Sequence, residues 1–231
     1  MEVGGCPLPE DRLYELDSEV WLRRDPSGST ASIGILATLG AFVGRFTSVT
    51  FRPGDGPLPR GRSVATLESV RSVGPLRLPV DGTVVERNLG LLERPKLLND
   101  DPYDAGWVVR LSIPPMPWPP PGLAPAAAIA GPLAERIHRL RIRCFPAVPD
   151  SEMYEIGAEC QAILVRLDEE IARRSPGEVV HLVTDDPTAP IEMVRWTDRT
   201  GHVVIDHRRE ETLHHFLVRK NPPPNSDPRP G

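Results

Sequence analysis

The sequence is almost without lysine, which limits the chemistry that the chain can perform. Of its 27 basic residues other than histidine, only Lys96 and Lys220 are lysines. A guanidinium stays protonated at any physiological pH, so a role that needs a nucleophilic amine is restricted to these two positions. The 32 acidic residues give a net charge of −5. We therefore expect neither nucleic acid nor an anionic membrane as a partner.

Cysteine is also scarce. Cys6, Cys144 and Cys160 show no repeated spacing, which predicts neither a disulfide framework nor a zinc site and fits a reducing cytoplasm. The first residues, MEVGGCPLPEDRLYELD, lack the basic and apolar regions of a signal peptide. No apolar run approaches the roughly 20 residues of a membrane helix. We expect a soluble, cytoplasmic protein.

Proline marks a change in composition near the middle of the chain. Residues 114–132 read PPMPWPPPGLAPAAAIAGP, and proline-rich segments are typically extended and semi-rigid. The sequence thus predicts a domain at 1–113, a spacer at 114–132, a second domain at 133–220 and a disordered tail at 221–231. For Trp118 in the spacer, packing back on a domain is favoured over docking into an aromatic groove of a partner, because an exposed indole is costly.

Residues 63–88 predict the central feature of the first domain. They read SVATLESVRSVGPLRLPVDGTVVERN, with short apolar runs separated by polar turns. Asp81-Gly82 between apolar runs predicts a second hairpin turn, because a primed turn needs positive φ. The other runs of residues 1–113, of which residues 14–23 are expected to form a single opening strand, are bounded by glycine and proline in the same way. They predict a compact, mostly antiparallel β structure.

This region resembles the glycine cleavage system H protein. The resemblance is carried by SIGILATLGAFVGRFTSVTFRPGDGPLPRGRSVATLESV, LESVRSVGPLRLPVDGTVVERN and NDDPYDAGWVVRL, and it spans roughly residues 14–111. It implies a barrel-sandwich hybrid of the lipoyl-carrier type. In the family, a Glu-Ser-Val-Lys tip presents a lysine whose lipoyl arm swings between partner enzymes. Here the matching residues are Glu68, Ser69, Val70 and Arg71.

Arg71 changes what the resemblance implies. Lipoylation requires a neutral amine, and arginine does not supply one. Neither Lys96 nor Lys220 lies in the turn. We therefore expect no lipoyl cofactor at the family position, while the surface that partner proteins would recognise remains.

The second half predicts a different architecture. Its order is a strand at 153–157, a helix at 160–174, a strand at 178–184, a helix at 190–198 and strands at 203–207 and 213–218. This β-α-β-α-β-β order is typical of a two-layer α/β sandwich. Taken together, the chain is expected to be a two-domain α+β protein.

The second half resembles the TusA family of sulfur carriers. The matching segments are YEIGAEC, SPGEVVHLVTDDP and HFLVRK. The resemblance places Cys160 at the cysteine of the family's Cys-Pro-x-Pro motif, where a thiolate accepts sulfane sulfur as a persulfide. Both prolines are missing, since Gln161 and Ile163 stand there, and the nearby Glu159 opposes thiolate formation. The alternative is that Cys160 is a small packed residue.

Other polar groups suggest no site. Glu68, Asp100 and Asp101 are expected to orient the hairpin and cap the following loop. Four histidines, at positions 202, 207, 214 and 215, have no ligand spacing. They predict a scattered exposed set and no metal site.

Two hypotheses follow. The first is a carrier or adaptor whose H-like domain docks on lipoyl-handling or sulfur-transfer proteins while Cys160 relays persulfide sulfur. The second is a structural or regulatory adaptor in which Cys160 is inert. In both, a carrier or adaptor is favoured over an enzyme, and an active Cys160 would make the chain a sulfurtransferase-type persulfide relay.

Overall fold

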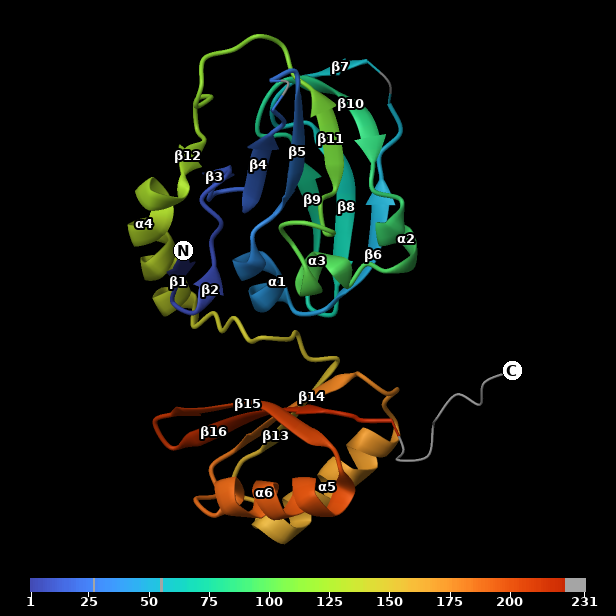
Figure 1. The fold of residues 1–231 in the computed structure, drawn as a ribbon, viewed down its shortest axis with the longest axis vertical. Coiled ribbons are helices and arrows are strands. Elements are labelled where there is room, and N and C mark those ends of the chain that lie inside the picture. The colour runs from blue at the N-terminus through green and yellow to red at the C-terminus, as the bar shows by residue number, and fades with distance from the viewer. Residues whose placement is uncertain (27, 55, 223–231) are drawn as a thin grey trace, which may run out of the picture. The chain divides into compact units, whose positions relative to one another are not determined.

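The computed structural model describes residues 1–26, 28–54 and 56–222, and it separates into two compact units (Figure 1). The first unit comprises Met1–Phe145 and the second Pro146–Gly231. Within the described residues, every helix is too short or too polar to cross a membrane.

The first unit is built mainly from β-strands. A seven-stranded sheet has the order β12-β3-β4-β5-β11-β10-β7, and a three-stranded sheet has the order β6-β8-β9. The strands of the large sheet are β3 (Leu13–Glu15), β4 (Val20–Arg24), β5 (Thr30–Ile35), β7 (Pro57–Leu58), β10 (Gly82–Arg87), β11 (Val109–Ser112) and β12 (Ala124–Pro125). The other elements up to residue 100 are β1 (Glu2–Val3), β2 (Cys6–Pro7), α1 (Ala37–Val43), β6 (Phe46–Phe51), β8 (Ser63–Ser69), β9 (Val73–Arg77), α2 (Gly90–Glu93) and α3 (Leu97–Asp100).

A ladder of apolar side chains explains why the large sheet holds together. Leu13 lies opposite Leu22, Leu22 opposite Ile33, and Ile33 opposite Val109. Each of the four side chains is buried. Directly opposed apolar residues on one face are the unit of sheet stabilisation, so this row fixes the register of four strands.

Two details differ from the sequence-based expectation. Asp81-Gly82 does not close a hairpin, because β9 belongs to the three-stranded sheet and β10 to the large one. The aspartate side chain instead accepts a hydrogen bond from the Arg60 amide, at 2.7 Å. The single opening strand expected near residues 14–23 is a hairpin, β3–β4, whose turn contains Glu19 with φ of 53°.

The expected spacer and domain boundary also need correction. Helix α4 (Ala126–Leu140) begins inside residues 114–132, and residues 133–145 belong to the first unit. Its buried side chains Ala126, Ile129, Leu133 and Ile137 recur every three to four residues and pack on Tyr14, Trp21 and Leu36. Tertiary packing of this stripe outweighs the low helix propensity of Pro132. Trp118 lies 4.9 Å from the Arg24 guanidinium, although it is 41% exposed.

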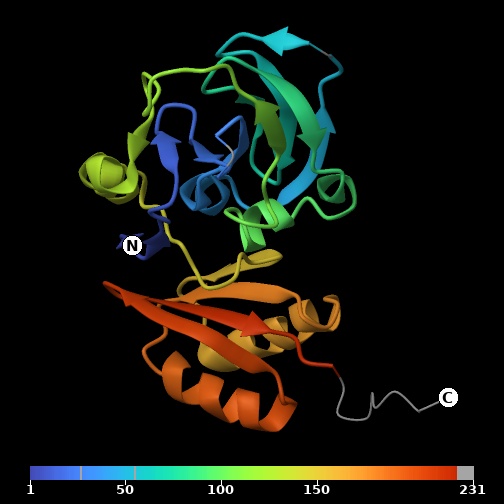
Figure 2. The same cartoon turned by 45° about the horizontal axis from the view of Figure 1, so that its top comes forward.

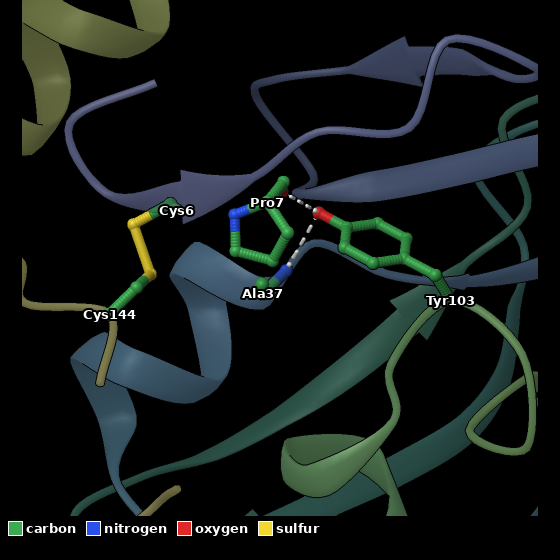
Figure 3. The surroundings of a disulfide bond; sticks show 5 residues. All are labelled: Cys6, Pro7, Ala37, Tyr103 and Cys144. Carbon is green, nitrogen blue, oxygen red and sulfur yellow. Dashed lines mark hydrogen bonds between the residues drawn. A yellow bond between two sulfur atoms is a disulfide. The ribbon is translucent and has the colours of Figure 1, made fainter. Parts of the chain in front are cut away.

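The expectation that the cysteines form no disulfide is wrong. Cys6 is bonded to Cys144, which lies 138 residues further along the chain (Figure 3). Beside this bond, the Tyr103 hydroxyl donates to the Pro7 carbonyl at 2.9 Å and accepts from the Ala37 amide at 3.1 Å. The bond therefore joins the N-terminal hairpin to the segment that follows α4.

The second unit has the expected β-α-β-α-β-β order. Its elements are β13 (Ser151–Glu155), α5 (Cys160–Ala172), β14 (Val179–Thr184), α6 (Ala189–Thr200), β15 (Val203–Glu210) and β16 (Leu213–Arg219). The sheet order is β13-β14-β16-β15, with β13 parallel to β14. Both helices cover one face of this sheet (Figure 2), and Leu167, Trp196 and Phe216 are buried between the layers.

Candidate functional site

The turn between β8 and β9 is a rigid loop seated on the end of α1. The Ser69 amide donates to the Ser72 carbonyl at 2.8 Å, and the Ser69 hydroxyl donates to the Val43 carbonyl at 3.0 Å. The Ser72 amide in turn donates to the Ser69 hydroxyl, at 3.0 Å. Ser69 is thus the residue that shapes the turn and fastens it to α1.

Arg71 occupies the exposed apex of this turn. Its guanidinium donates to the Phe42 carbonyl at 3.3 Å. The side chains of Phe42, Val70 and Val73 are 46%, 56% and 67% exposed and form an apolar surface close to the arginine. The turn therefore presents a permanent cation among exposed apolar side chains, which suits recognition by another protein.

Gly44 allows the turn to approach α1 this closely. It has φ of 82°, and a Cβ at this position would lie 2.8 Å from Val70 Cγ2. Any other residue would be strained in this conformation and would collide with the turn. A glycine at this position is therefore required by the contact.

A pocket of about 590 Å³ opens beneath the hairpin, and all its lining residues belong to the first unit. One part of its wall is apolar and is formed by Leu39, Phe42, Val43, Phe46, Leu67 and Leu76. The polar part includes Glu15, Glu19 and Arg136. Pockets of this size with an apolar wall and a few polar groups are typical of small-ligand sites.

Sequence reasoning did not identify Glu19 and Arg136, which form the polar end of the pocket. Arg136 Nη2 lies 2.8 Å from Glu19 Oε1. Burial raises the pKa of Glu19, and the Arg136 charge partly offsets that rise. The two residues are 117 positions apart and come from the β3–β4 turn and from α4, so no local pattern could have paired them.

Neither of the two lysines belongs to the turn. Lys96 precedes α3 and lies 3.9 Å from Asp100. Lys220 belongs to the second unit, where its ammonium donates to the Arg174 carbonyl at 2.6 Å. Neither takes the place of an amine at position 71.

The carboxylates near the turn have structural positions. Asp101 accepts hydrogen bonds from the Asp104 and Ala105 amides and so caps the loop after α3. Glu68 pairs with Val73 across the hairpin. The structure does not bring these carboxylates together as a reactive set.

Cys160 is the first residue of α5 and the one cysteine outside the disulfide. Its backbone amide donates to the Asp186 carboxylate, which also accepts from the Thr188 amide and hydroxyl. Burial and then the Asp186 charge raise the pKa of the thiol, while a hydrogen bond with Thr188 opposes the rise. A carboxylate thus takes the helix-end amide that would otherwise favour a thiolate.

The histidines are not the scattered exposed set that the sequence suggested. His207 Nε2 lies 3.0 Å from His214 Nδ1, and His181 Nε2 lies 3.0 Å from His215 Nδ1. His207 also stacks on Phe216 with a centroid distance of 4.3 Å. Among the described residues, no group of three or more His, Cys, Asp or Glu side chains is placed to hold a metal ion.

The comparisons with known proteins concern the first unit. Residues 12–117 match the glycine cleavage H-protein family. The chain is 34% identical over 110 residues to glycine cleavage system H protein 2 of Aquifex aeolicus, covering 48% of this chain and 68% of that protein. It is 39% identical over 114 residues to H protein 5 of the same organism, covering 48% and 76%.

A solved structure of a glycine cleavage system H protein from Mycobacterium marinum is also similar. It is 25% identical, covers 55% of this chain and 98% of its own, and has a TM-score of 0.47. With matched sequence covering more than two thirds of each Aquifex protein, the chain belongs, through its N-terminal half, to the glycine cleavage H-protein family.

Proposed function

We propose that this protein is an adaptor whose H-protein-like unit docks on partner proteins without carrying a lipoyl group at the hairpin. The observation that carries the proposal is Arg71, which stands at the apex of an intact turn. Ser69 and Gly44 still hold that turn against α1. A turn that keeps its shape but has no reactive amine can bind a partner protein, although it cannot carry a lipoyl group.

The partners that we propose are protein components of the glycine cleavage system or other lipoyl-handling proteins, in the cytoplasm. Their surfaces would meet the exposed Phe42, Val70 and Val73 around Arg71. A small apolar area beside a charge is typical of the centre of a protein interface.

Replacing Arg71 with lysine tests whether lipoate ligase recognises the turn. Lipoate ligase and lipoate should leave the natural protein unmodified but should lipoylate Arg71→Lys, as seen by intact mass. Arg77→Lys, also exposed on the same hairpin, is the control and should stay unmodified. An unmodified Arg71→Lys variant would mean that the surface itself has been lost.

A second candidate function is persulfide transfer by Cys160. It is supported by the β-α-β-α-β-β order, by the TusA-like segments and by a thiol at the start of α5. In the transfer step, the Cys160 thiolate attacks the outer sulfur of a donor persulfide. The new S–S bond forms as the donor's S–S bond breaks, and the donor thiolate leaves. Burial and then the Asp186 charge raise the pKa of Cys160, and both therefore disfavour this step.

Incubation with a persulfide donor separates the two functions. A carrier should gain one reducible sulfur at Cys160, and Cys160→Ser should not. If the natural protein gains none while Arg71→Lys is lipoylated, the adaptor is the function of the chain and Cys160 is a packed residue.

A further inference from the structure

The end of the β8–β9 hairpin that lies away from the turn is rich in arginine. Residues 52–80 contain five arginines and only two acidic residues, although the whole chain has a net charge of −5. Strand β8 has seven residues, so its two ends are roughly 20 Å apart. In Figure 1, β7, which leads into β8, and α1, which holds the turn, lie at opposite ends of the first unit.

Backbone and side-chain contacts place two of these arginines on either side of β8. Arg52 follows β6, and its Nη2 donates to Thr66 Oγ1 at 3.2 Å. Arg77 lies opposite Ser63 across the hairpin, and its Nη1 donates to the Gly61 carbonyl at 2.9 Å. The beginning of β8 therefore lies between two guanidinium groups that are fixed by hydrogen bonds.

Two further arginines are held at the same end of the hairpin. The Arg62 carbonyl accepts from the Leu78 amide at 2.9 Å, which places Arg62 beside the end of β9. Arg87 is half-buried, and its Nη2 donates to the Gly54 carbonyl at 3.0 Å and to the Arg52 carbonyl at 3.4 Å. We call the basic edge the set formed by Arg52, Arg62, Arg77 and Arg87.

The charges of the basic edge are not compensated. In the part of the chain that the structure describes, none of the four arginines forms an ion pair. Arg60 and Arg110, by contrast, are paired with Glu15 and Glu86. Hydrogen bonds to neutral carbonyl and hydroxyl oxygens orient a guanidinium without neutralising it. This end of the first unit is therefore positive and attracts anionic groups.

The chemistry of the edge narrows the class of anion. A guanidinium binds carboxylates and phosphates through paired donors. Tight binding of nucleic acid depends on contacts with many phosphates, and the net charge of −5 opposes the approach of so dense a polyanion. In an extended acidic peptide, alternate carboxylates are about 7 Å apart. The long side chains of Arg52 and Arg77, on either side of one strand, can reach two such groups.

We propose that the basic edge is a second docking surface, which binds a carboxylate-rich segment of a partner protein. The exposed Arg52, Arg62 and Arg77 pair with its carboxylates, and Arg87 adds charge while it holds the loop before β7. This surface is separate from Arg71, so it goes beyond docking at the turn, and the two ends of the hairpin can bind different partners.

Fluorescence anisotropy with the full-length protein at low salt tests the proposal. The probe is a labelled peptide of alternating glutamate and serine, and its control has glutamine in place of each glutamate. The acidic peptide should bind at least about tenfold more tightly than the control, and added salt should weaken it. An oligothymidylate of equal length should bind more weakly than the acidic peptide. Equal binding of the two peptides, or tighter binding of the oligothymidylate, would overturn the proposal.

Variants locate the binding on the basic edge. The triple glutamine variant (Arg52→Gln, Arg62→Gln, Arg77→Gln) should bind the acidic peptide at least about tenfold more weakly. A matched triple variant removes the same charge from exposed positions elsewhere in the first unit, namely Arg94→Gln, Arg139→Gln and Arg141→Gln. It should bind within about twofold of the natural protein. Equal losses in the two triple variants would contradict a localised surface.

Two more variants separate charge from folding and from the turn. Lysine at positions 52, 62 and 77 keeps the charge and should retain most of the binding. A loss as large as that of the triple glutamine variant would show that the charge is not responsible. Arg71→Gln should leave peptide binding intact, and a tenfold loss there would place the acidic segment at the turn and overturn the proposal.

Discussion

At the scale of single residues, Arg71 in the first unit and Asp186 in the second set the charge beside the positions that we propose to be functional. Arg71 places a permanent positive charge at the turn, and Ser69 maintains the backbone of that turn. In the second unit, Asp186 occupies the amide at the start of α5. Under the functions that we propose, Arg71 supplies no amine for lipoylation, and Asp186 makes the Cys160 thiolate more costly to form.

The role of Asp186 can be measured through the thiol. Asp186→Asn removes a negative charge close to Cys160, so the thiolate becomes less costly and the pKa of Cys160 should fall. The midpoint of the iodoacetamide reaction rate against pH should move to lower pH. Asp198→Asn, near the exposed end of α6, is the matched control and should leave the midpoint unchanged. An unchanged midpoint in Asp186→Asn would show that burial alone sets this pKa.

At the scale of elements, α4 and the N-terminal hairpin β1–β2 lie outside the family match and complete the first unit. They form a second core with Trp21 and Tyr103 and are joined by the Cys6–Cys144 bond. The β8–β9 hairpin, by contrast, lies within the H-protein match at residues 12–117. The segments outside the match therefore contribute a helix, a disulfide and one wall of the pocket to the first unit.

Removal of the disulfide should weaken the first unit. The Cys6→Ala, Cys144→Ala double variant loses a cross-link that closes a long loop, which typically contributes about 2 to 4 kcal/mol. Urea unfolding should show that loss, and hydrogen exchange should quicken in α4. Cys160→Ala is the control and should leave the unfolding of the first unit unchanged. Equal unfolding midpoints with and without reductant would contradict the expectation.

The sequence predicted some of these elements and not others, for physical reasons. The order of the second unit was predictable because its apolar residues recur with clear strand and helix periods, as in residues 160–172. The Cys6–Cys144 pair was not, since spacing alone does not determine connectivity. The start of α4 was not predicted, because proline and alanine in residues 114–132 indicated an extended spacer. The stability of this helix depends on its packing. Glu19 and Arg136 meet only in the folded chain.

At the scale of the whole molecule, the two units should respond differently to acid. Five of the six histidines lie in the second unit. Burial lowers the pKa of His202 and His214 below 6.5. The unfolded chain then binds more protons than the folded one as the pH falls through about 6.5, so the second unit loses stability below that pH.

Calorimetry at pH 7.5 and 5.5 tests this expectation. The transition of the second unit should move to lower temperature at the lower pH, and the His202→Gln, His214→Gln double variant should reduce that shift. His138→Gln, an exposed site in the first unit, should not. If the double variant keeps the full shift, other groups are responsible for it.

The bond between Cys6 and Cys144 also makes the first unit a covalent ring, with the second unit attached outside it. A protease that cuts the chain once between these residues opens the ring but releases no fragment. The two pieces remain one molecule until the disulfide is reduced. Gel electrophoresis of a nicked sample would therefore show a single band without reductant and two bands with it.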